Sequence, residues 1–144
     1  MNKFVDGRTS QNASFANSIA IPILVINTPQ LFGQIGLSTE GIGANPRVIL
    51  TGTIALQLPL ALLGITVTVV RGTSPTDPVV YSATSTFDLS VLAPQIVSFS
   101  AADFNPPVVG SEIVYTAFVS SNLLGTVRVG PENFDGILMS DSPV

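Results

Sequence analysis

The chain has 144 residues, of which 46% are apolar and only 10% are charged, and its formal net charge is −4. An ordinary globular domain carries about 25% charged residues, so this composition indicates large buried interfaces together with a surface coat of Ser and Thr. The scattered arginines and the single lysine exclude a basic nucleic-acid surface, and the absence of Cys and His excludes disulfides and zinc sites built on those ligands.

The chain begins with a polar segment, residues 1–15, which is interrupted by Phe4, Val5 and Phe15. Terminal segments of this composition seldom form core elements, so we expect an extended N-terminal arm or connector followed by a β-sandwich domain of residues 16–144. The segment has no apolar stretch typical of a secretory signal. Either the chain is not exported by such a signal or a leader has been removed.

Short runs of β-type apolar residues separated by turn residues follow the arm. We expect strands at 18–27, 31–37, 47–58, 63–71, 79–90, 95–104, 112–121, 125–130 and 134–140. Alternation is clearest in 63–71, whose odd-numbered apolar residues should share one face. Because no segment shows a sustained helical period, we expect no long helix. The pattern predicts an all-β antiparallel two-sheet sandwich of eight or nine strands, with a jelly roll as the leading topology and an immunoglobulin-like Greek key second.

The uncharged stretch of residues 48–70 is long enough for a membrane-spanning helix. It contains Gln57 and Pro59, however, and residues 65–70 alternate with a period of two, which a helix in lipid does not require. We therefore interpret this stretch as a β-hairpin and expect no membrane insertion.

Few residues suit catalysis or metal binding. Asp77, Asp103, Glu132 and Asp135 lie in or beside expected turns, where acids usually serve the turn or the surface. Calcium is conceivable at Glu132 and Asp135, but two acids do not fill its coordination shell. A Ser–Lys pair would need Lys3, which lies in the arm. We therefore expect no enzyme activity, no cofactor and no metal.

The arm provides the best positive hypothesis about function. An extended tail with spaced apolar residues can add a strand to the sheet edge of a neighbouring molecule. Backbone hydrogen bonds would supply affinity, and Phe4, Val5 and Phe15 would fill pockets between strands. Such a head-to-tail contact does not close on itself, so repeated copies give a filament.

Four segments resemble small β-sandwich proteins of the Bacillus cereus group spore surface, which include exosporium proteins and endospore appendage subunits. They are NPRVILTGTIALQL, ITVTVVRG, PVVYSATSTFDLS and VVGSEIVYTAFVSS, and the resemblance spans residues 16–140. It implies an extracellular, pilus-like fibre or exosporium subunit, trimeric or head-to-tail polymeric, with copies of itself and a spore-surface anchoring protein as partners. Disulfide-linked appendage subunits of that group are Cys-rich, so the resemblance implies a fibre of the non-disulfide kind.

Two other functions remain open. A trimeric jelly roll could bind a carbohydrate or a host surface, although sugar platforms favour exposed aromatic rings, and Tyr81 and Tyr115 both fall in expected strands. A viral or phage coat or fibre protein would also use a jelly roll and would also need self-association.

Overall fold

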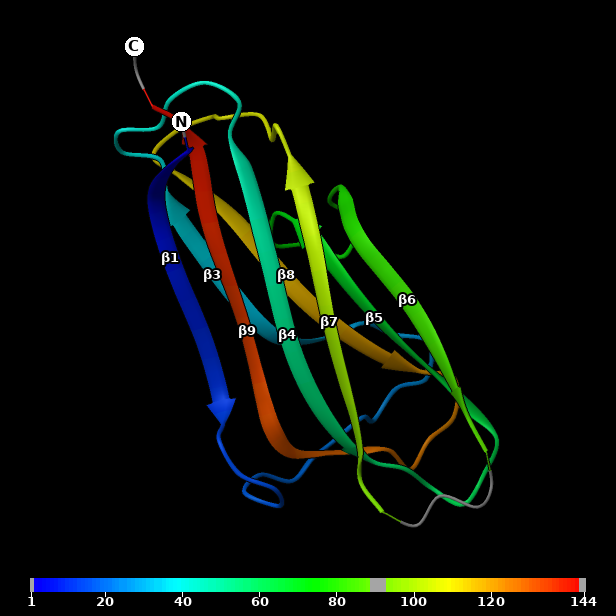
Figure 1. Ribbon diagram of the computed structural model, residues 1–144. Coiled ribbons are helices and arrows are strands. Elements are labelled where there is room, and N and C mark those ends of the chain that lie inside the picture. Colours follow the sequence, from blue (N-terminus) through cyan, green and yellow to red (C-terminus); the bar gives the residue numbers. More distant parts are fainter. Residues whose placement is uncertain (1, 89–92, 143–144) are drawn as a thin grey trace.

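The computed structural model describes residues 2–88 and 93–142 (Figure 1). Over these residues it contains strands and no helix, so no helix long and apolar enough to cross a membrane is found there. The strands are β1 (Asn2–Ala13), β2 (Ile21–Pro22), β3 (Gln30–Ser38), β4 (Arg47–Gln57), β5 (Leu63–Arg71), β6 (Val79–Phe87), β7 (Gln95–Phe104), β8 (Glu112–Ser121) and β9 (Val127–Asp141).

The strands form two antiparallel sheets that face each other. The β1 sheet has the order β1-β9-β4-β7, with the short β2 also paired to β9, and the β3 sheet has the order β3-β8-β5-β6. Apart from β2, the pairing is nested: β1 pairs with β9, β3 with β8, β4 with β7 and β5 with β6. This nested pairing is that of a jelly roll, so the expected fold class and leading topology are confirmed.

The core lies between the sheets and is filled by alternate residues of each strand. In β5 the odd-numbered apolar residues from Leu63 to Val69 are buried, as their alternation predicted. The outward side chains of the same strand are threonines, and Thr66 and Thr68 make hydroxyl contacts of 2.8 and 3.4 Å with partners on β6. The expected polar coat therefore covers this part of the β3 sheet.

The hairpin interpretation of residues 48–70 is wrong. This stretch contains β4 and β5, but β4 belongs to the β1 sheet and β5 to the β3 sheet. The chain crosses between the sheets at residues 58–62. A jelly roll wraps a long pair of strands around the core, so consecutive strands at this point face each other across the core and share no hydrogen bonds.

Two other expected strand boundaries differ. Of residues 18–27, only Ile21–Pro22 pairs, because Pro22 lacks an N–H for the ladder and Asn27 adopts a positive φ of 52°. Two strands were expected at 125–130 and 134–140, but residues 127–130 and 134–140 both belong to the single strand β9. Pro131 does not end this strand because it lies in a bulge, where the register with β4 shifts between Ile54 and Leu56.

Two of the four acids that we assigned to turns or to the surface, Asp103 and Glu132, are buried. Asp77 does serve a turn, since its carboxylate accepts hydrogen bonds of 2.9 Å from the N–H groups of Thr73 and Ser74. By contrast, Asp103 lies in β7, and Glu132 and Asp135 lie in β9. Glu132 is fully buried. The sequence reading failed because buried acids with an arginine partner have the same local pattern as turn acids.

Asp103 links the two sheets. It accepts two hydrogen bonds of 2.8 Å from Arg71 of β5 and one of 2.6 Å from the hydroxyl of Tyr115 of β8. Burial, reinforced by the hydrogen bond to Asp103, raises the pKa of Tyr115 well above its usual range. Tyr115 is therefore a neutral hydrogen-bond donor inside the core and is not available as a surface ring for sugars.

Candidate functional site

The segment expected to act as an arm forms β1 and occupies one edge of the β1 sheet (Figure 1). It runs antiparallel to β9, with ten paired positions from Asn2↔Asp141 to Ala13↔Glu132. This pairing is formed within one chain. A β1 strand donated by a neighbouring copy would pair with the same residues of β9. Strand addition between copies therefore stays a prediction, and so does the division of the chain into an arm and a sandwich domain.

Side chains of β1 also bind the backbone of β3, the edge strand of the opposite sheet. The Asp6 carboxylate accepts a 2.7 Å hydrogen bond from Ser38 N–H, and Ser10 Oγ accepts one of 3.4 Å from Gln34 N–H. Asn12 Nδ2 donates to the carbonyl of Phe32 at 2.7 Å. An unpaired strand edge presents such groups as a template for other chains. β1 therefore covers the β3 edge with side chains and closes this side of the sandwich.

Asp6 is held in its charged form by these contacts. The hydrogen bond from Ser38 N–H, assisted by the Arg8 guanidinium at 3.0 Å, lowers the pKa of Asp6 below its ordinary value. An acceptor that stays ionised makes stronger hydrogen bonds than a neutral one. The contact between Asp6 and β3 is therefore strongest when the carboxyl is deprotonated.

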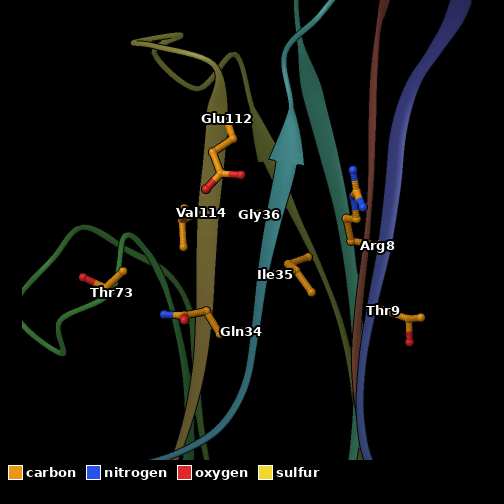
Figure 2. A pocket seen from close by; sticks show the side chains of 8 residues that line it. All are labelled: Arg8, Thr9, Gln34, Ile35, Gly36, Thr73, Glu112 and Val114. Atoms are coloured by element: carbon orange, nitrogen blue, oxygen red, sulfur yellow. The ribbon is translucent and has the colours of Figure 1, made fainter.

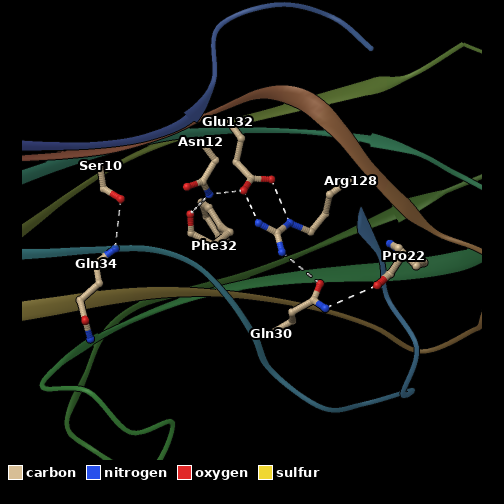
Figure 3. A network of polar contacts seen from close by, with 8 residues as sticks. All are labelled: Ser10, Asn12, Pro22, Gln30, Phe32, Gln34, Arg128 and Glu132. Atoms are coloured by element: carbon tan, nitrogen blue, oxygen red, sulfur yellow. Dashed lines mark hydrogen bonds and ion pairs between the residues drawn. The ribbon is translucent and has the colours of Figure 1, made fainter. Parts of the chain in front are cut away.

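A buried ion pair lies where β1 ends (Figure 3). Glu132 and Arg128 of β9 are 0% and 4% exposed, and Arg128 Nε donates to Glu132 Oε2 at 2.9 Å. A second guanidinium nitrogen contacts the other carboxylate oxygen, Oε1. Arg128 also donates to Gln30 Oε1 at 3.4 Å. Asn12 Nδ2 donates to Glu132 Oε1 at 2.5 Å, so β1 contributes one of the hydrogen bonds that satisfy this buried carboxylate.

Asn12, Asp6 and Ser10 were missed by the sequence analysis. They lie two and four residues apart in a polar segment, a spacing that places them on one side of a strand. The even spacing of these residues is visible in the sequence. Their hydrogen-bond partners on β3 could not be predicted from it, because β3 is brought beside β1 only by the fold.

The three residues expected to anchor the arm lie in different surroundings. Val5 is half-buried at a bulge in β1 and packs against the core. Phe4 is 65% exposed on the outer face of the β1 sheet, and Phe15, just beyond the end of β1, is 74% exposed. Within the chain, therefore, Val5 packs inward while Phe4 and Phe15 leave large apolar surfaces open.

Apolar side chains are also exposed at the end of the sandwich opposite the termini. Leu24, Val25 and Ile26 line a hollow of about 520 Å³ together with Leu123 and Leu124. A 2.9 Å hydrogen bond from Ile23 N–H to the Thr126 carbonyl joins these two loops. This end therefore adds to the apolar surface that is available to another molecule.

Another hollow on the surface is mainly polar. It has a volume of about 540 Å³ and lies where β1 passes β3 and β8 (Figure 2). Arg8 and Glu112 are the charged side chains that line it. The described ranges contain no group of three or more acidic residues positioned to hold a metal ion. The hollow therefore provides polar contacts from both sheets.

No protein-family model matches the chain, and no curated protein matches it. Among solved structures, the chain is similar to a chain of the viral particle of infectious bursal disease virus, with 8% identity and a TM-score of 0.39 over 99% of this chain. It is also similar to VP2 of a subviral particle of that virus, with 8% identity and a TM-score of 0.31 over 96% of this chain. The chain spans 36% and 38% of those two chains.

Proposed function

We propose that this chain is a structural subunit that self-assembles non-covalently and that copies exchange β1, each strand pairing with β9 of a neighbour. The observation that carries the proposal is the way β1 is held. Its ladder joins it to β9, and Asp6, Ser10 and Asn12 join it to β3. None of these contacts uses the linking residues 14–20. A β1 strand from another copy can therefore make all of them.

Exchange costs little once the linker opens, because the same contacts form in either arrangement. A strand that leaves its own chain and enters the next makes a heterologous contact, and repeated contacts of that kind extend without closing. The low charge content also limits the repulsion that would keep copies apart. The product would be a thin fibre.

An engineered disulfide tests the exchange directly, because the natural chain has no cysteine. Thr9 of β1 and Asp135 of β9 are register partners, and both side chains reach the solvent-facing side of the sheet. In the variant Thr9→Cys/Asp135→Cys, oxidation after assembly should link successive copies. A denaturing gel without reductant would then show a ladder of multimers. Bands of monomer size alone would reject exchange.

A matched pair controls for random cross-linking. Thr53 of β4 and Ser98 of β7 are also register partners, with hydroxyl groups 3.2 Å apart. Neither strand takes part in the proposed exchange, so Thr53→Cys/Ser98→Cys should give monomers only. Multimers in this variant would show that the ladder reports collision between copies and not exchange.

We also propose the spore surface as the site of assembly. This rests on the resemblance of residues 16–140 to spore-surface sandwich proteins of the Bacillus cereus group. Immunogold labelling of spores with antibody against the purified chain should decorate the exosporium or its appendages. Labelling confined to the spore interior would reject this location.

A further inference from the structure

One half of the outer face of the β1 sheet is apolar. The register places Phe4, Met139, Arg47 and Phe104 in one row across the four strands, and Gly7, Ile137, Ile49 and Ala102 in another. Side chains paired across strands share a face, and the intervening Val48 and Leu138 are buried in the core. We call Phe4, Ile49, Phe104 and Ile137 the apolar half-face.

Over the other half of this face the same strands carry mostly polar side chains, although Ile96 of β7 is 63% exposed there. Continuing along β4, Thr51 pairs with Ser100 and Asp135, and Thr53 pairs with Ser98 and Asn133. A face turned only toward water favours polar residues at each outward position. The change from Thr to Ile within β4 therefore marks the boundary between a polar half and an apolar half of this face.

The exposed fractions indicate how much surface is involved. Phe4 and Phe104 are 65% and 72% exposed, and Ile49 and Ile137 are 43% and 44% exposed. Together they present several hundred Å², comparable to the largest apolar patch of a typical monomer, about 300 to 600 Å². When the polar residues around the apolar half-face are included, the exposed area approaches the roughly 800 Å² per partner of a standard protein interface.

The charge within the half-face is already neutralised. The Arg47 guanidinium donates to Asp141 at 3.1 Å and to the Asn45 carbonyl at 2.8 Å, so it does not require an acidic partner. The fitting partner is an equally flat, uncharged apolar surface. A second copy of this chain offers one in its own half-face, and sheets pack face to face at about 10 Å through such surfaces.

We infer that the apolar half-face packs against the half-face of a second copy, about a two-fold axis. This contact is separate from the exchange of β1, although its choice of a second copy as partner rests on the proposed self-assembly. Two-fold pairing through the sheet faces would join strand-exchanged chains side by side, whereas exchange alone would join them end to end.

The variant Ile49→Thr/Ile137→Thr tests the inference. It extends the Thr51 and Thr53 pattern of the same face and keeps β-branched side chains, so the fold should persist. Sedimentation equilibrium should show that the dissociation constant of the two-fold pair rises at least about tenfold. A tenfold rise corresponds to a loss of only about 1.4 kcal/mol of binding free energy. Ile96→Thr, on the polar part of β7 with 63% exposure, should pair like the parent.

A single-cysteine variant reports the geometry. In Ile137→Cys, the introduced thiol can form a disulfide only with the equivalent thiol of another copy, because the chain has no other cysteine. A two-fold contact that brings the two half-faces together should make this covalent dimer form readily on oxidation. Unchanged pairing in the threonine variant, or no dimer from the cysteine variant, would overturn the inference. The Thr9→Cys/Asp135→Cys ladder should survive Ile49→Thr/Ile137→Thr, so failure of one proposal is distinguishable from failure of the other.

Discussion

At the scale of single residues, Asn12 connects β1 to the rest of the molecule. Its amide nitrogen serves both the Phe32 carbonyl and the buried Glu132 carboxylate. A buried acceptor that loses its donor costs more than the hydrogen bond contributed, since the acceptor cannot return to water. Asn12 therefore fixes the position of β1 on β9 by a polar contact that a shifted register would break.

Asn12→Ala should lower the free energy of unfolding by about 1 to 3 kcal/mol, because it removes hydrogen bonds to the Phe32 carbonyl and to the charged Glu132 carboxylate, whose Oε1 keeps only its Arg128 contact. Urea denaturation measures this difference. The neighbouring Gln11 contacts Ser14 at the surface, and Gln11→Ala should change stability by about 0.5 kcal/mol or less. Equal effects of the two substitutions would contradict the role given to Asn12.

Glu132→Gln should have a larger effect. It leaves the Arg128 guanidinium, only 4% exposed, without its counter-charge. Breaking one partner of a buried ion pair typically costs about 3 to 5 kcal/mol. Asp135→Asn, at a half-buried position on the same strand, is the matched control. If both variants melted at the temperature of the parent, the buried pair would not contribute as described.

Asp6 predicts a dependence on pH. Its pKa is lowered in the folded chain from an ordinary value of 3.8 by Ser38 N–H and Arg8. Its contribution is therefore complete above the unfolded pKa and is lost as pH falls through the lower folded pKa. The urea midpoint of the parent should fall as the solution is acidified below pH 3.8, and Asp6→Asn should reduce that fall. Parallel curves would contradict the assignment.

At the scale of elements, β1 lies between β9 and β3 and contacts both, so we expect it to bind them also as a separate peptide. A chain lacking residues 1–15 should melt at a lower temperature, because β9 and β3 lose a hydrogen-bonded neighbour and Glu132 loses Asn12. Adding a peptide of residues 1–15 at about 100 times its dissociation constant should restore about 2.7 kcal/mol. Calorimetric titration measures the binding, with a peptide carrying Asn12→Ala as control. A shortened chain with undiminished stability and no peptide binding would contradict this view of β1.

At the scale of the whole molecule, alternation in the sequence was sufficient to predict most strands and the sandwich. The segment 112–121 was predicted with the boundaries that β8 has, because both of its ends carry turn residues. The polar β1 was expected as an arm, since strand recognition relies on apolar alternation and β1 makes its inward contacts through Asp6, Ser10 and Asn12.

The candidate site was predicted in part. Residues 1–15 were selected as the segment of interest, but the anchors Phe4 and Phe15 are exposed in the chain while unselected polar residues make the contacts. The buried pair of Arg128 and Glu132 also escaped prediction. Its members are separated by Pro131, and their burial follows from a long-range register that no local pattern encodes.

Negative-stain electron microscopy of the purified full-length chain tests the central claim of self-assembly most directly. Each copy has a mass of 15.0 kDa, so unassembled chains would form a field of very small particles. The exchange of β1 predicts thin, unbranched filaments that lengthen as concentration rises and that shorten when excess peptide of residues 1–15 competes for β9 and β3. Discrete small particles at every concentration would contradict the assignment of this chain as a fibre subunit.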